Sequence, residues 1–172
     1  MHQSQRQRTL EEWIETHSGL IHKVVRAYAF SRHDAEDLLQ EIAVQLWDSI
    51  PRFRGQAKVS TWIYRVALYA AMAWSRRERG HAERTEALIT IPAEEEPEED
   101  PRVTWLYAQI AKLDTVDRSL ALLLLEGMSY REMAETLGIT ETNLSVKVHR
   151  LKRTLTERSD APTANQGARH GL

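Results

Sequence analysis

The chain has 172 residues, of which 42% are hydrophobic and 28% charged, an ordinary balance for one or two small globular domains. Sparse glycine (7) and proline (5) argue against the many tight turns of a β-sandwich or barrel, and we expect an all-α fold. The absence of cysteine excludes disulfides, thiolate metal sites and thiol catalysis. Because no apolar run approaches ~20 residues and the N-terminus lacks a signal peptide's apolar core, we expect a cytoplasmic protein without membrane insertion.

The net charge of −2 hides an uneven distribution along the chain. Residues 1–81 carry 12 basic and 9 acidic side chains, whereas residues 82–101 carry 1 basic and 8 acidic. Residues 102–172 carry 10 basic and 8 acidic side chains. Two mildly basic lobes therefore flank an acidic strip, and the slightly negative total does not exclude a nucleic-acid partner.

Helical patterns dominate the first lobe. Residues 1–8 are polar, and we expect them to be disordered. Thr9, with Glu12 at capping-box spacing, predicts a helix start. Ser31 is the expected N-cap of a second helix that ends before Pro51. A basic loop over 51–59 follows, and a third helix is expected from Ser60 or Thr61 to a stop at Gly80.

The second lobe begins after a linker. Residues 82–101 contain PAEEEPEEDP, which is too charged and proline-rich to build a core and predicts a flexible tether. Helices are expected over 102–113, capped by Asp100, and over 115–126, where the leucine run predicts burial nearly all round. A capping box from Ser129 to Glu132 predicts a short helix to Leu137. A last helix over 141–157 and a disordered tail over 159–172 complete the prediction.

The segment 129–155 has the layout of a helix-turn-helix. Its last helix carries an apolar stripe of Leu144, Val148, Leu151 and Leu155, which should face inward. The opposite face is polar and basic, which suits base edges and phosphates in a major groove. It comprises Asn143, Ser145, Lys147, His149, Arg150, Lys152 and Arg153. The alternative is a solvated basic face on an ordinary helical hairpin.

Cations and aromatic residues alternate over 52–79, a composition that suits single-stranded nucleic acid because bases stack on rings while cations follow phosphates. The cations are Arg52, Arg54, Lys58, Arg65, Arg76, Arg77 and Arg79, and the aromatics are Phe53, Trp62, Tyr64, Tyr69 and Trp74. The alternative is that Trp62 and Trp74 belong to the core and that the arginines form a solubilising rim.

A run of carboxylates, DAEDLLQE over 34–41, favours a protein-docking face over chemistry. Acidic residues suit a helix's first turn, and no histidine completes a metal-ligand set. No phosphate-binding glycine loop occurs either. We therefore predict no catalytic residues, no metal and no cofactor, and we do not expect an enzyme.

The chain resembles bacterial RNA polymerase sigma factors of the extracytoplasmic-function (ECF) group in three segments: DAEDLLQEIAVQLW, STWIYRVALYAAMAWSRR and LDTVDRSLALLLLEGMSYREMAETLGITETNLSVKVHRLKRTL. The resemblance covers about residues 10–80 and 103–156. It implies a region-two helical bundle over 9–81 and a region-four helix-turn-helix over 102–158, joined by the acidic linker 82–101.

The resemblance also implies residue roles. Docking on the clamp helices of the polymerase's largest subunit is implied for Asp37, Leu38, Gln40 and Glu41. Capture of the unpaired −10 strand is implied for Arg52, Phe53, Arg54, Lys58, Trp62, Arg65, Tyr69, Arg76 and Arg77. Recognition of the −35 duplex is implied for Asn143, Ser145, Lys147, His149, Arg150 and Arg153. Tyr69 and Ala73 stand where that family often has Asn and Asp, and an aromatic at 69 can stack on a base.

The resulting hypothesis is a promoter-recognition subunit that lends core polymerase its sequence specificity and assists melting of the −10 element. Its implied partners are core RNA polymerase, including the flap of the second-largest subunit, promoter DNA and an anti-sigma factor. We expect a monomer when the chain is free. The alternatives are a stand-alone helix-turn-helix transcriptional regulator and a helical adaptor that binds no DNA.

Overall fold

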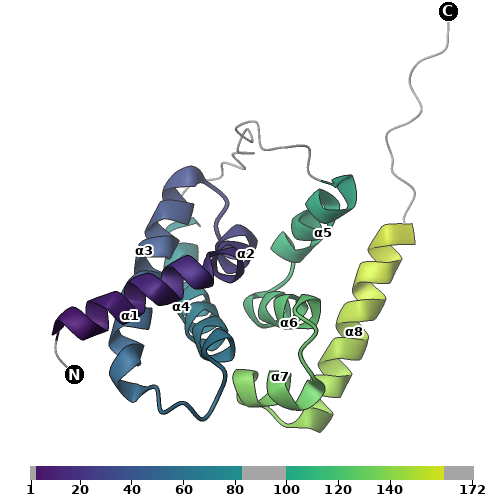
Figure 1. The fold of residues 1–172 in the computed structure, drawn as a ribbon. Coiled ribbons are helices and arrows are strands. Elements are labelled where there is room, and N and C mark those ends of the chain that lie inside the picture. The colour runs from purple at the N-terminus through teal and green to yellow at the C-terminus, as the bar shows by residue number, and fades with distance from the viewer. Residues whose placement is uncertain (1–2, 83–99, 161–172) are drawn as a thin grey trace, which may run out of the picture. The chain divides into compact units, whose positions relative to one another are not determined.

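The computed structural model describes residues 3–82 and 100–160 of the chain. These residues form eight α-helices and one short 3-10 helix, and no strand occurs among them, which confirms the all-α prediction. The chain divides into two compact units, residues 1–127 and residues 128–172. Figure 1 shows the helices in chain order from purple to yellow.

Six helices and the 3-10 helix make up the first unit. They are α1 (Gln3–Thr16), α2 (Ser18–Tyr28), α3 (Arg32–Ser49), η1 (Ile50–Arg52), α4 (Val59–Ala82), α5 (Pro101–Ala111) and α6 (Thr115–Leu125). Helices α3 and α4 pack against each other along their length. Their buried side chains form the centre of the core, among them Leu38, Ile42, Leu46, Ile63 and Leu68. Ser31 caps α3 by accepting a hydrogen bond from the Asp34 amide, as predicted.

Helices α5 and α6 pack with the N-terminal helices in this unit, although the sequence assigned them to the second lobe. The hydroxyl of Tyr28 donates to the carbonyl of Thr115 at 2.7 Å and lies 2.5 Å from Ser119 Oγ. Lys23 and Glu126 form an ion pair at 2.6 Å. As predicted, Asp100 caps α5, and its hydrogen bonds with Arg102 lower the pKa of the Asp100 carboxyl.

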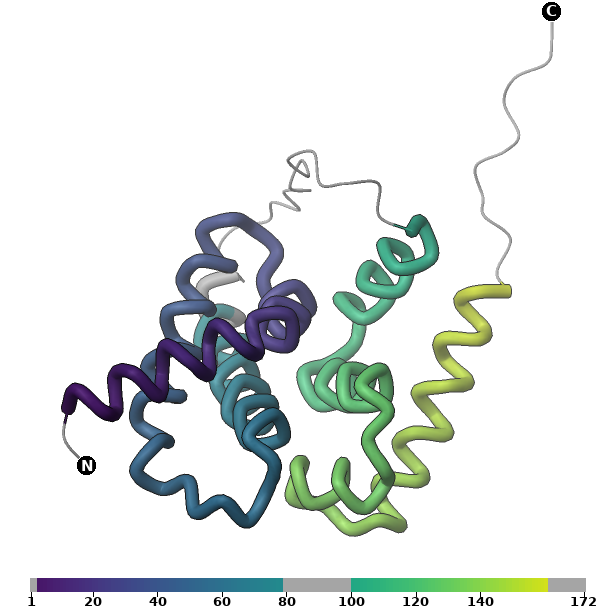
Figure 2. Tube along the Cα trace, in the orientation of Figure 1, coloured from purple at the N-terminus to yellow at the C-terminus, as the bar shows by residue number. Residues whose placement is uncertain are grey.

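The second unit contains α7 (Tyr130–Leu137) and α8 (Glu141–Asp160), joined by a tight turn that is visible in Figure 2. Both halves of the predicted capping box are present at Ser129 and Glu132. Gly138 ends α7 with a left-handed backbone, φ 67°, a conformation that a side chain would strain. The two helices bury Met133, Ala134, Leu144, Val148 and Leu151. This arrangement confirms the predicted helix-turn-helix.

The prediction of a disordered segment before Thr9 is wrong for residues 3–8, because α1 begins at Gln3. Thr9 lies inside the helix, where its hydroxyl donates to the Gln5 carbonyl rather than forming a cap. Long-range contacts hold this first turn in place. The Arg6 guanidinium donates to the Trp47 carbonyl at 2.6 and 2.9 Å, and its carbon lies 4.2 Å from the Trp47 ring centroid.

The end of one helix and the burial of another also differ from the prediction. Helix α4 continues through Gly80 to Ala82, so Gly80 is not its stop; glycine lowers helix propensity without forbidding the conformation. The leucine run is buried at Leu122 and Leu123, but Leu125 is 50% exposed at the end of α6. The predicted linker lies outside the described residues except at its two ends, and so does the predicted tail beyond Asp160.

We expect Tyr64→Phe to stabilise the protein by about 1 kcal/mol, because the Tyr64 hydroxyl is buried without a hydrogen-bond partner among the described residues. Burial, assisted by the charge of Glu126, raises the pKa of Tyr64 above its ordinary value. The unfolded chain therefore loses this proton first, and wild-type stability should fall as the pH rises above about 10. Urea unfolding of both proteins between pH 8 and 11 tests this; an unchanged or larger alkaline loss in the variant would contradict it.

Candidate nucleic-acid interface

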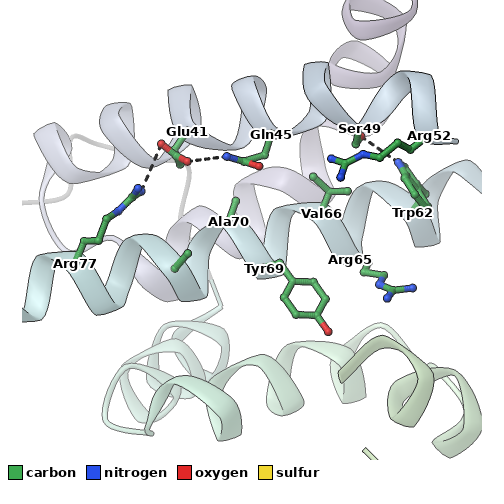
Figure 3. A pocket seen from close by; sticks show the side chains of 11 residues that line it. Glu41, Gln45, Ser49, Arg52, Trp62, Arg65, Val66, Tyr69, Ala70 and Arg77 are labelled. Carbon is green, nitrogen blue, oxygen red and sulfur yellow. Dashed lines mark hydrogen bonds and ion pairs between the residues drawn. The ribbon is translucent and has the colours of Figure 1, made fainter. Parts of the chain in front are cut away.

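A groove of about 460 Å³ runs between α3 and α4. In Figure 3, Glu41, Gln45 and Ser49 of α3 face Val66, Ala70 and Arg77 of α4, whereas Arg65 and the Tyr69 ring extend from the side of α4 that faces away from α3. Its lining combines cations, one carboxylate, two neutral polar residues, an aromatic pair and small apolar residues: Glu41, Gln45, Ser49, Arg52, Trp62, Arg65, Val66, Tyr69, Ala70, Ala73 and Arg77. The groove thus brings together residues that the sequence assigned separately to polymerase docking and to the −10 strand.

One end of the groove is polar. Gln45 Nε2 donates to Glu41 Oε1 at 3.1 Å, and Arg77 approaches the other Glu41 oxygen at 3.4 Å. Arg77 is largely exposed, so this ion pair is screened by solvent and contributes little to stability. The Arg77 guanidinium can therefore exchange Glu41 for a phosphate at small cost.

The aromatic residues in the groove, Trp62 and Tyr69, and Phe53 beside it divide into structural and accessible ones. Phe53 packs edge-on against Trp13 with centroids 5.5 Å apart and against Trp62 at 5.6 Å. Trp62 also donates from Nε1 to Ser49 Oγ at 3.1 Å. Phe53 and Trp62, both predicted to contact the −10 strand, are thus partly covered by the protein itself.

Tyr69 has the accessible ring. Its side chain is 41% exposed, and the Arg65 guanidinium carbon lies 5.9 Å from the ring centroid. Arg65 and Tyr69 stand one turn apart on α4 and line the same groove (Figure 3). A ring with a neighbouring cation can stack a base while the cation pairs with the adjacent phosphate. Trp74, by contrast, is 6% exposed and belongs to the core, as the alternative reading of this segment held.

The loop between η1 and α4 is open to solvent. Gly55 adopts φ 70°, a left-handed turn that favours glycine. Six of the cations named for 52–79 have described side chains, and these six are exposed: Arg52, Arg54, Lys58, Arg65, Arg76 and Arg77. Arg76 donates from Nε to the Met72 carbonyl at 3.3 Å. The loop and the helix start therefore present one basic surface beside the groove.

The predicted docking motif is only partly at the surface. Asp37 and Gln40 are exposed and Glu41 is half-buried, but Leu38 is 0% exposed and offers no surface to a partner. Leu38 belongs to the core, and the docking role implied for it stays a prediction. Its neighbour Leu39 is 37% exposed and takes the surface position.

Two indole hydrogen bonds tie α3 to α4. Trp74 Nε1 donates to Asp37 Oδ2 at 3.2 Å, and Trp62 Nε1 donates to Ser49 Oγ at 3.1 Å. Asp37 lies near the start of α3 and pairs with Trp74 in the second half of α4, whereas Ser49 ends α3 and pairs with Trp62 near the start of α4. The two helices therefore run antiparallel. Asp37 is therefore not a free surface carboxylate, and replacing it also removes the partner of a buried indole.

Helix α8 presents the predicted polar face. Asn143, Ser145, His149, Arg150 and Arg153 are exposed, and Lys147 is half-buried at the edge of the apolar stripe. Leu144, Val148 and Leu151 are buried, whereas Leu155 is only half-buried. Thr140 Oγ1 accepts from the Asn143 amide at 3.1 Å and caps the helix. Arg153 lies 3.7 Å from Glu157, an exposed pair.

On the α3 side of the groove, sequence reasoning missed Gln45 and Ser49, and on the α4 side it missed Val66 and Ala70. The two α3 residues had a signal in the sequence. Both follow Glu41 on α3 at steps of four residues, and this spacing places all three on one helix face. Helical periodicity from Glu41 was the signal that could have found them.

Among the described residues, no group of three His, Asp or Glu side chains is placed to hold a metal ion. The described helices include none long and apolar enough to span a membrane.

Two family models match the chain. Residues 13–81 match the Sigma-70 region 2 model, and residues 104–155 match the Sigma-70, region 4 model. The first match contains the groove and the docking motif, and the second contains the helix-turn-helix.

Curated relatives agree with these matches. The chain is 28% identical over 150 residues to the ECF RNA polymerase sigma factor SigE of Mycolicibacterium smegmatis, covering 81% of this chain and 57% of that protein. It is 27% identical over 127 residues to the RNA polymerase sigma factor YlaC of Bacillus subtilis, covering 69% and 73%. The chain thus spans little more than half the length of the first relative.

Solved structures share the fold. The chain superposes on the sigma factor RpoE of Bartonella quintana, solved in complex with the anti-sigma factor NepR, with a TM-score of 0.67 at 17% identity, covering 88% of this chain and 96% of that one. It superposes on CnrH, solved in complex with the cytosolic domain of CnrY, with a TM-score of 0.65 at 20% identity, covering 91% of each chain.

Proposed function

Because this chain belongs to the sigma-70 family and groups with its ECF members, we propose that it directs core RNA polymerase to specific promoters and assists melting of the −10 element. The observation that carries the proposal is the α3–α4 groove, which is lined on one side by the docking helix α3 and on the other by an accessible aromatic ring and exposed cations of α4. A stand-alone regulator that binds only duplex DNA needs no such groove. The proposal assigns no catalytic step to this chain.

The division of labour follows the two family matches. We assign polymerase docking and the −10 strand to a region-two domain over 9–81 and the −35 duplex to a region-four domain over 102–158. The segment 82–101 serves as an acidic linker and 159–172 as a tail. In the docking surface Asp37, Gln40 and Glu41 face the clamp helices of the largest subunit, with Leu39 beside them and Leu38 supporting them from the core.

The residues proposed to contact the −10 strand have different roles according to their exposure. Tyr69 stacks an unpaired base, while Arg65 and Arg77 pair with phosphates on either side of it along the groove. Arg52, Arg54 and Lys58 lead the strand over the open loop. Phe53 and Trp62 shape the groove from within their aromatic cluster rather than stacking bases themselves.

The proposed partners are core RNA polymerase, promoter DNA and an anti-sigma factor. The two structural neighbours were both solved in complexes, one of them with a protein described as an anti-sigma factor, and this supports the third partner. This activity places the chain in the cytoplasm, where the bacterial polymerase and chromosome lie.

Transcription in vitro with core polymerase and a pool of promoter fragments tests the proposed function. Transcripts are expected from a defined subset of promoters only when the chain is added, and core polymerase alone is the control. Specific duplex binding by the free chain, with no gain in transcription, would favour the regulator instead.

Tyr69→Ala is expected to reduce promoter opening more than closed-complex formation, because loss of one base-stacking ring costs about 1–3 kcal/mol. This corresponds to roughly a 5- to 150-fold loss in the open-complex equilibrium. Permanganate reactivity of unpaired thymines measures opening, and filter binding at low temperature measures the closed complex. Tyr69→Phe keeps the ring and should behave as wild type; an equal effect of the alanine on both steps would exclude stacking.

A further inference from the structure

Helix α8 carries an apolar side chain at the centre of its polar face. Val146 is 46% exposed, whereas Leu144, Val148 and Leu151 on the same helix are buried. At 100° per residue, Val146 lies about 160° around the helix from Leu144, so it points away from the core of its unit. The predicted polar face of this helix did not include Val146.

Neither packing nor helix propensity accounts for a valine at this position. Valine is a poorer helix former than the lysines and arginines that occupy most of this face. Single exposed apolar residues are common on protein surfaces, but Val146 is placed differently. Asn143 precedes it by three residues and Arg150 follows it by four, so all three share one face, and both neighbours are exposed polar groups.

This face is rigidly presented. The Thr140 hydroxyl accepts a hydrogen bond from the Asn143 amide, Leu144 is buried in the first turn of α8, and α8 packs against α7. Valine has one strongly preferred rotamer in a helix, so its two methyl groups project in fixed directions. Val146 therefore offers a preformed apolar contact between hydrogen-bonding residues.

We propose that Val146 contacts the C5-methyl group of a thymine in the −35 element and thereby selects an A·T pair at that position; this rests on the proposed function. Thymine is the base that presents a methyl group in the major groove, and a side chain without donors or acceptors can read it only by apolar contact. Cytosine at the same place would set the outward N–H of its amino group, left without an acceptor, against the valine methyls.

The helix geometry also places the thymine relative to Asn143. Three residues advance about 4.5 Å along a helix, close to the ~3.4 Å spacing of base pairs. Asn143 and Val146 therefore read neighbouring base pairs. Because an asparagine amide pairs with the N6 and N7 edge of adenine, the selected thymine lies next to a base pair whose adenine Asn143 contacts.

The test uses holoenzyme reconstituted from core polymerase and the full chain. Wild-type holoenzyme first selects −35 sequences from a randomised duplex library. Each thymine of the selected element is then replaced by deoxyuridine, which keeps the base pair and removes only the methyl group. Affinities are compared for wild type, Val146→Ser and the matched control Val116→Ser, an exposed valine on α6.

One deoxyuridine position is expected to weaken wild-type binding about three- to fivefold, the value of one buried methyl group. At that position Val146→Ser should show no further loss, while Val116→Ser should respond as wild type. If no deoxyuridine matters, or the serine variant responds as strongly as wild type, Val146 does not read thymine and the proposed function stands. Failure of wild-type holoenzyme to select any −35 sequence would overturn the proposed function and this inference together.

Discussion

Leu38→Ala should lower the free energy of unfolding by about 2–5 kcal/mol, because the side chain is 0% exposed and its removal leaves a cavity between α3 and α4. Small domains are stable by only about 5–15 kcal/mol, so this single change removes a large share. Urea unfolding followed by circular dichroism gives the value. Loss of polymerase binding by this variant should track the fraction unfolded.

Gln40→Ala is the matched surface variant for the same motif. Gln40 is exposed on α3, and exposed substitutions usually change stability by no more than about 0.5 kcal/mol. Its polymerase binding should fall while the urea midpoint stays at the wild-type value. Two results together would contradict this: folded Gln40→Ala pulls down as much core polymerase as wild type, and folded Leu38→Ala pulls down less. Leu38, and not Gln40, would then contribute directly to docking.

Replacing Lys147, Arg150 and Arg153 together with alanine should make promoter binding by the holoenzyme much less sensitive to salt. Each phosphate contact contributes about 0.9 to the slope of log affinity against log salt. Three lost contacts reduce the slope by about 2.7, so the loss of affinity between about 50 and 200 mM salt shrinks roughly 40-fold. Closed-complex affinities over a salt series measure this slope.

The control for this prediction is Lys112→Ala, an exposed cation that follows α5 and lies outside α8. It should leave the slope unchanged. Sequence preference separates the two kinds of contact on α8, since the triple variant should weaken all −35 sequences alike. An unchanged slope in the triple variant would mean that another surface neutralises the phosphates.

Local signals predicted the second unit well. The reciprocal cap at Ser129 and Glu132 and the left-handed turn at Gly138 depend on neighbours in the chain, so their residue types and spacing are sufficient evidence. The buried stripe of α8 likewise follows from a 4-3-4 spacing of apolar residues. The polar face opposite that stripe follows from the same spacing.

Features set by distant residues could not be predicted this way. The start of α1 depends on Arg6 binding the backbone of Trp47, 41 residues away. Whether an aromatic residue in 52–79 can stack on a base or belongs to the core depends on contacts such as those of Trp62 with Ser49 and of Phe53 with Trp13. The residue types of the groove could be predicted from the sequence. Which aromatic rings stay accessible depends on the antiparallel packing of α3 and α4, which could not be predicted.

The two indole hydrogen bonds between α3 and α4 have a mechanical consequence. They join residue 37 to 74 and residue 49 to 62, so the two ties stand 12 residues apart on each helix, about 18 Å. A helix pinned at two such points can neither slide by a turn nor swivel about one contact. The helix pair then keeps a fixed distance between the two surfaces: with polymerase docked on α3 as proposed, the position of Tyr69 is set, and we expect the DNA strand to move to reach that ring.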